Sequence, residues 1–171
     1  MPPPSIGRVT ADFFTDSYRF SANVLVYKRR LVDILSDRLT DYLDLMDVYI
    51  SRINSPGDIV GTYQKGSLVK NEINLILLSS EADAISEERF YVPNRVSLPI
   101  FITVPSFEIQ GRFQWMGAFD MKKLMTTDTQ KFFPVLTATA TNAHFPKVTF
   151  EGPIILVNKV KVEVLCLGEA T

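Results

Sequence analysis

Five aspartates are the first candidates for chemistry in this sequence. Asp33, Asp37, Asp41, Asp44 and Asp47 follow one another at intervals of four, four, three and three residues. Paired carboxylates can bind divalent cations or divide acid and base work between them. This series, however, crosses from an expected helix into an expected strand, and basic residues beside it supply charge partners. We interpret it as a solvated acidic face and predict no metal site.

A basic triplet, Lys28, Arg29 and Arg30, stands where an expected strand gives way to an expected helix. An anion placed there could also meet the amides of the helix N-terminus. With Tyr27 beside it, the triplet is a candidate contact for nucleic acid or a small anion. The corresponding stretch later in the chain, residues 117–119, reads Gly-Ala-Phe, so no such site is repeated.

The remaining polar residues suggest no catalytic centre. His144 is the single histidine, and it lies in an expected loop with no serine or cysteine motif to pair with. Cys166 falls in an alternating apolar run with Val162 and Val164, which predicts a small core side chain. The glycines form neither a dinucleotide-binding nor a phosphate-binding motif. We therefore predict no catalytic residues, no cofactor and no enzyme activity.

Aromatic residues offer a different kind of site. Trp115 and Phe119 belong to a stretch rich in aromatic side chains. Trp115 aligns with Val26 in the first half, and Tyr27 is the aromatic residue next to Val26. Most such side chains fill a core, but an exposed Trp is a common anchor in protein interfaces. Trp115, Phe119 and Tyr27 are therefore candidate contacts for a protein partner.

Composition narrows the class of protein. The 171 residues are 46% hydrophobic, which is typical of a folded chain, and 18 basic against 19 acidic residues give a net charge of -1. This balance provides no general attraction to nucleic acid. One cysteine fits a reducing compartment, and neither a signal peptide nor an apolar membrane segment is evident, so we expect a cytoplasmic protein.

The apolar pattern predicts the elements that would position these residues. Alternation predicts a hairpin from Val9 to Val26. Arg29 to Leu39 has an apolar stripe of a short helix, formed by Leu31, Ile34, Leu35 and Leu39. A strand from Leu43 to Ile50 follows, with a register change around Met46, and further strands are expected at Ile59 to Tyr63 and at Leu68 to Leu78.

The same order of elements recurs in the second half of the chain. Phe20 matches Ile109 at an offset of 89 residues, and after one extra residue near Gly117 the offset becomes 90, which pairs Leu31 with Met121. Self-similarity at a fixed offset is the signature of an internal repeat. We predict an N-terminal arm at 1–7, a first repeat at 8–80, a linker at 81–96 and a second repeat at 97–171.

These repeats predict an α+β fold that is predominantly β. Each repeat contributes a hairpin, a short helix and two or three further strands, and two open sheets can share one core as a sandwich or a small barrel. The expected core residues in the first repeat are large and apolar: Phe13, Phe20, Val24, Leu31, Leu35, Leu45, Ile73 and Leu75.

Part of the first repeat resembles an uncharacterised family of bacterial proteins. The likeness lies in Arg30 to Ser36, RLVDILS, and Tyr42 to Val48, YLDLMDV, which are similar to an RLSDxLN-like helix start and a FLxLxDV-like strand in that family. Val32 and Ser36 depart from the pattern. The resemblance covers about 35 residues. It implies a bacterial cytoplasmic protein and supplies no activity or site residues.

Together these observations favour a non-enzymatic binding or assembly protein that presents a sheet edge, an aromatic patch or its N-terminal arm to a partner or to itself. The alternative is a regulatory module that binds nucleic acid or a small anion near Lys28 to Arg30.

Overall fold

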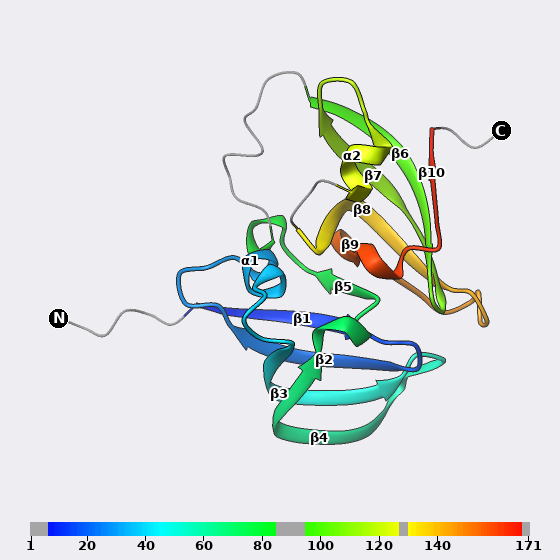
Figure 1. Cartoon of the computed structure of the whole chain (residues 1–171). Helices are drawn as coiled ribbons and strands as arrows, with labels where there is room; N and C mark the ends of the chain where they lie inside the picture. The colour runs from blue at the N-terminus through cyan, green and yellow to red at the C-terminus, as the bar shows by residue number, and fades with distance from the viewer. Residues whose placement is uncertain (1–6, 85–94, 127–129, 169–171) are drawn as a thin grey trace.

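The computed structural model describes residues 7–84, 95–126 and 130–168, in which antiparallel strands predominate (Figure 1). The expected N-terminal arm, apart from Gly7, and residues 85–94 of the expected linker lie outside these ranges. The first half contains β1 (Arg8–Phe14), β2 (Tyr18–Leu25), α1 (Leu31–Ser36), β3 (Tyr42–Arg52), β4 (Ser55–Val69), η1 (Lys70–Glu72), β5 (Leu75–Leu78) and η2 (Glu81–Asp83). The second half contains β6 (Arg95–Val104), β7 (Phe107–Met116), α2 (Met121–Thr126), β8 (Phe132–Asn142), β9 (Thr149–Asn158), η4 (Lys159–Lys161) and β10 (Val164–Leu167).

The ten strands form one sheet in the order β10-β6-β7-β8-β9-β5-β1-β2-β3-β4. The prediction of a mostly β protein with short helices is therefore confirmed. A sandwich of two separate sheets is not what forms, because hydrogen bonds between β5 and β9 join the two halves edge to edge. Figure 1 shows the first half below and the second half above, with β5 and β9 between them.

A β-bulge bends the sheet at the predicted register change. Ser21 lies opposite Tyr49 whereas Asn23 lies opposite Met46, so β3 has one residue more than β2 at this point. Asp47 takes a left-handed conformation there, with φ of 51°. Bulges of this kind increase the local twist of a strand pair and curve the sheet.

Two apolar clusters fill the interior, and each takes side chains from both halves. The first is built mainly on the first half but includes Phe132, Leu136, Ile154 and Leu156. The second is built mainly on the second half but includes Phe14, Ile53 and Leu75. The expected core residues are all buried except Phe20, which packs partly exposed against the first cluster.

The helix α1 is shorter than the predicted Arg29 to Leu39. The chain leaves the helical conformation at Asp37, whose ψ is 120°, and the Asp37 carboxylate accepts a hydrogen bond of 2.9 Å from the Leu39 amide. An aspartate that bonds the backbone in this way competes with helix continuation. Leu39 is consequently 91% exposed, and its assignment to the buried stripe was wrong.

Two strand predictions also need correction. Ile59 to Tyr63 lies within a longer strand, β4, which continues to Val69. The expected strand from Leu68 to Leu78 is divided, because the turn of η1 separates the end of β4 from β5. Cys166, expected in the core, is exposed. Alternation predicts that a strand has two faces but not which face is covered. On β10 it is Leu165 and Leu167 that pack against the second cluster.

Candidate interaction surface

The basic triplet is largely occupied by contacts within the chain. A guanidinium nitrogen of Arg29 lies 3.2 Å from a carboxylate oxygen of Asp37, and the Arg30 guanidinium donates to the Ala82 carbonyl. Lys28 is exposed. The structure thus keeps the triplet at the start of α1, as predicted, with two of its three side chains bonded to groups of the first half.

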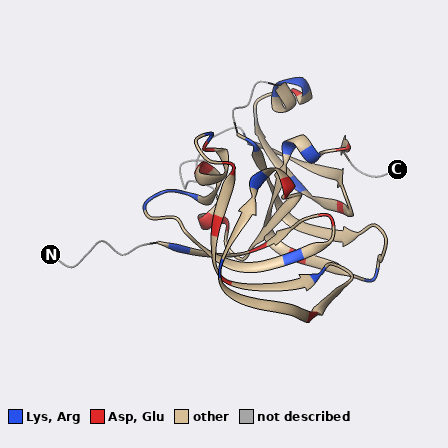
Figure 2. Cartoon of the chain, turned by 60° about the horizontal axis from the view of Figure 1, so that its bottom comes forward, with Lys and Arg blue, Asp and Glu red and all other residues tan. Residues whose placement is uncertain are grey.

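The acidic series is spread over α1, the following turn and β3. Asp44 accepts from Ser67 at 3.4 Å and Asp47 from Asn23 at 3.2 Å. The pKa of Asp37 is lowered, first by the hydrogen bond from the Leu39 amide and then by Arg29. Within the described ranges no three acidic, His or Cys side chains are grouped so that they could hold a metal ion. In the view of Figure 2, basic and acidic residues are interspersed over the chain.

Trp115 and Phe119 lie in one aromatic group that packs against the second apolar cluster. Their ring centroids are 5.2 Å apart, and Phe113 packs against both at 6.0 and 5.9 Å. The indole nitrogen of Trp115 donates to the Ala118 carbonyl at 3.1 Å. Tyr27 belongs to the first half, where it is 61% exposed, so the structure unites two of the three predicted partner contacts.

His144 lies in the turn between β8 and β9. It is exposed, and its backbone amide donates to the Asn142 side chain at 2.9 Å. The buried Asn142 shapes this turn, since its side-chain oxygen also accepts from the Phe145 amide. This placement agrees with the expected loop residue.

Lys70 is a buried cation that sequence reasoning missed. Its residue is only 2% exposed, and its ammonium donates to the carbonyls of Ile34 and Asp37 at 2.7 and 3.1 Å. It therefore binds the carbonyls at the C-terminus of α1, where the Ile34 carbonyl also accepts from the Asp37 amide. Burial lowers the pKa of Lys70 below its ordinary value. A lone lysine after a strand gives no sequence signal of such a role.

The two outermost strands of the sheet are β4 and β10. In the part of the chain that the structure describes, no strand pairs with the outer edge of either. β10 is short and one of its faces is exposed, with Val164 at 47% exposure and Cys166 also exposed. Unpaired edges present free backbone amides and carbonyls to another strand.

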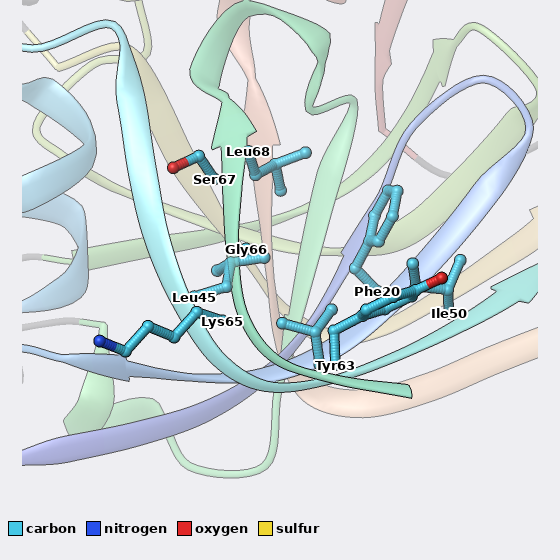
Figure 3. A pocket seen from close by; sticks show the side chains of 9 residues that line it. Phe20, Leu45, Ile50, Tyr63, Lys65, Gly66, Ser67 and Leu68 are labelled. Atoms are coloured by element: carbon cyan, nitrogen blue, oxygen red, sulfur yellow. The ribbon is translucent and has the colours of Figure 1, made fainter. Parts of the chain in front are cut away.

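Beside β4 the surface is hollowed into an apolar groove of about 160 Å³. Figure 3 shows Phe20, Ile50 and Tyr63 gathered at one end and Lys65 turned away from them. Gly66 lines the groove next to Val48, since a Cβ added at Gly66 would lie 3.4 Å from the Val48 side chain. The remaining lining residues are Ser67 and Leu68.

No described helix is long and apolar enough to cross a membrane. Comparison of the chain with protein-family models, curated proteins and solved structures finds no match.

Proposed function

We propose that the protein is a non-enzymatic assembly protein, built by tandem duplication of one β-rich unit, that associates through the edges of its sheet. The described residues offer side chains for association rather than for catalysis. The exposed Val164 and Cys166 on one edge strand, and the apolar groove along the other, are the surfaces that support this function.

The backbone supports the duplication more strongly than the side chains do. The helices α1 and α2 are offset by 90 residues at both ends, and so are β3 and β8. Left-handed residues recur at the same offset, since Asp47 corresponds to Thr137 and, when the extra residue is placed before Gly117, Tyr27 corresponds to Gly117. Thr137 lies at a register shift between β7 and β8, as Asp47 does between β2 and β3. Non-glycine residues seldom adopt this conformation, so recurrence at matched bulges is unusual.

One observation carries the proposal: the two halves of the chain already associate by adding one sheet edge to another. β5 of the first half pairs with β9 of the second over four residues. The outer strands β4 and β10 have the same places in their halves as β9 and β5. A chain that holds its own halves together in this way has the means to add further copies.

The alternative function, regulation through nucleic acid or a small anion bound at Lys28 to Arg30, has less support. Arg29 and Arg30 already bond to Asp37 and Ala82, and they would have to exchange these contacts for a phosphate. Binding of this kind weakens steeply with salt. Loss of salt-sensitive binding to an oligonucleotide in a Lys28/Arg29/Arg30 triple alanine variant would favour the alternative.

Light scattering during size exclusion tests the proposal. We expect masses that are multiples of the 19.3 kDa chain, with the larger species increasing at higher protein concentration. Because edge pairing and apolar burial depend little on ionic strength, the masses should persist in high salt. A strictly monomeric protein at every concentration would show that self-association is wrong.

A further inference from the structure

We infer that the outer edge of β10 in one copy of the chain pairs with the outer edge of β4 in the next copy, in the arrangement that β5 and β9 adopt within the chain. This inference rests on the proposed self-association and names the two surfaces and their register. The partner is therefore a second copy of the same protein, and the contact joins two different edges.

The pairing of β5 with β9 is the template. The strands are antiparallel, with Leu75 opposite Val157 and Leu78 opposite Ile154. The Asn158 amide donates to the Asn74 carbonyl at 3.1 Å, which extends the pairing by one residue. Side chains on both faces of this pair are buried in the two apolar clusters, so the junction is sealed from water on either side.

β4 is the counterpart of β9 by its own pairing. Tyr42 of β3 lies opposite Val69 of β4, and Phe132 of β8 lies opposite Asn158 of β9. The residue numbers on β3 and β8 therefore differ by 90, and those on β4 and β9 differ by 89. The agreement continues along the strands, since Val48 lies opposite Tyr63 and Ala138 opposite Gly152.

β10 is the counterpart of β5 in the same sense. Leu75 lies opposite Phe14 of β1, and Val164 lies opposite Thr103 of β6, so both members of the pair are offset by 89. The turns that lead into the two strands correspond as well. The Asn74 amide donates to the Phe14 carbonyl and the Glu163 amide to the Thr103 carbonyl, both at 2.8 Å.

The register between copies follows from that of β5 and β9 when 89 is added to each residue number of β5, which gives β10, and 89 is subtracted from each residue number of β9, which gives β4. The expected cross-strand pairs are Val164 with Leu68, Leu165 with Ser67, Cys166 with Gly66, and Leu167 with Lys65.

The exposed side chains of β10 and the groove beside β4 are complementary in this register. Val164 and Cys166, which face solvent in a single copy, correspond to Leu75 and Leu77, which pack in the second cluster across from β9. Opposite Cys166 stands Gly66, whose missing side chain opens the apolar groove along β4 (Figure 3). Two small side chains thus meet a groove of about 160 Å³.

The symmetry of the contact sets the kind of assembly. Because β10 and β4 are different surfaces, each added copy leaves one β10 edge and one β4 edge for the next. Such heterologous contacts form a ring where the rotation closes and a helical filament where it does not.

A disulfide between two copies would test the proposed register of β10 and β4 directly. The Asn158 amide donates to the Asn74 carbonyl, so the backbone groups of Asn158 point towards β5. Because backbone groups alternate in direction along a strand, those of Ile155 point away from β5, and Leu77 and Ile155 are a non-hydrogen-bonded pair. The corresponding pair between copies is Cys166 and Gly66. Cα atoms at such positions are about 4.5 Å apart, within the range that a disulfide spans.

We would oxidise the Gly66→Cys variant and separate it on a non-reducing denaturing gel. The expected result is a ladder of covalent multimers, because each chain can then bond to two neighbours, and in a ring the top band counts the copies. The matched control is Gly57→Cys, on the same strand, where an added side chain meets nothing within 4 Å. The control should not form the ladder.

A charge on β10 tests the same contact without crosslinking. Val164→Glu should leave the single copy folded, because the side chain is 47% exposed, but should weaken assembly by about 100-fold or more, since a carboxylate would be buried without a partner. The control Val96→Glu alters a valine of 43% exposure at the far end of β6 and should assemble as the wild type does.

The outcomes separate this inference from the broader proposal. Oligomers that persist in Val164→Glu, together with no ladder from Gly66→Cys, would overturn the β4–β10 contact and leave self-association in place. A wild type that is monomeric throughout would overturn both. Should Val164→Glu lose its circular dichroism spectrum, the crosslinking result decides alone, because that variant keeps Val164.

Discussion

Replacing the buried Lys70 by methionine should destabilise the fold markedly. The ammonium donates to the Ile34 carbonyl at 2.7 Å, the Asp37 carbonyl at 3.1 Å and the Thr40 hydroxyl at 3.3 Å. A hydrogen bond to a charged group contributes about 1.5–3 kcal/mol, so the two carbonyl contacts together contribute about 3–6 kcal/mol. Removal of a desolvated charge offsets part of the loss. We expect a net decrease of about 2–4 kcal/mol in the free energy of unfolding.

Urea unfolding followed by circular dichroism measures this decrease. Methionine retains an unbranched apolar stem, so the variant loses the ammonium with little change in packing. The control is Lys147→Met, an exposed lysine, which should stay within about 0.5 kcal/mol of the wild type. If Lys70→Met were as stable as this control, the ammonium would not hold the end of α1 as we argue.

The pH dependence gives a second readout for the same variant. Burial lowers the pKa of Lys70 below 10.5 in the folded protein, so between that lowered pKa and 10.5 the unfolded chain binds more protons. Stability from this group therefore increases as pH rises through that window. The difference in unfolding free energy between the wild type and Lys70→Met should widen towards alkaline pH. A difference that narrows would contradict the assigned cause of the pKa shift.

Three further predictions concern other parts of the fold. The pKa of Asp37 is lowered in the folded protein, so its carboxylate adds stability that is present above pH 3.8 and is lost as the pH falls through the folded-state pKa. In thermal unfolding, Asp37→Asn should therefore be less stable than the wild type near neutral pH and should converge with it in acid. Gly111→Ala should cost about 1–3 kcal/mol in urea unfolding, since its Cβ would stand 2.8 Å from the Leu136 carbonyl oxygen, whereas Gly57→Ala should cost little. The fragment 1–85 should show no cooperative thermal transition, because four side chains of the second half complete its core cluster; a folded fragment would contradict the shared core.

Period-2 alternation and the apolar helical stripe were enough to predict a mostly β fold with short helices, but not the single ten-stranded sheet. These patterns predict β1, β2 and β3, the presence of α1 and the bulge near Met46. They do so because the apolar side chains of each element face the core and therefore recur with the period of that element. The end of α1 was missed because Leu39 fits the stripe, whereas the Asp37 hydrogen bond that ends the helix is a local polar contact.

The candidate surface was harder to predict than the elements. Cys166 and Val164 alternate like core residues, and only the order of strands in the sheet shows that β10 is outermost and leaves them exposed. The groove depends on the absence of a side chain at Gly66, which has no periodic signal. Lys70 was missed because its partners lie more than thirty residues away in sequence.

The place of β5 in the sheet also governs how the chain folds during synthesis. β5 can pair with β1 as soon as Leu78 has left the ribosome, but its other edge must wait for β9, which ends at Asn158, eighty residues later. At about 5–20 residues per second, this edge stays open for about 4–16 s. All four of its side chains are apolar, so a neighbouring nascent chain that offers its own β9 competes with the correct partner. Chains translated side by side on one messenger would therefore exchange halves more often than chains refolded at high dilution.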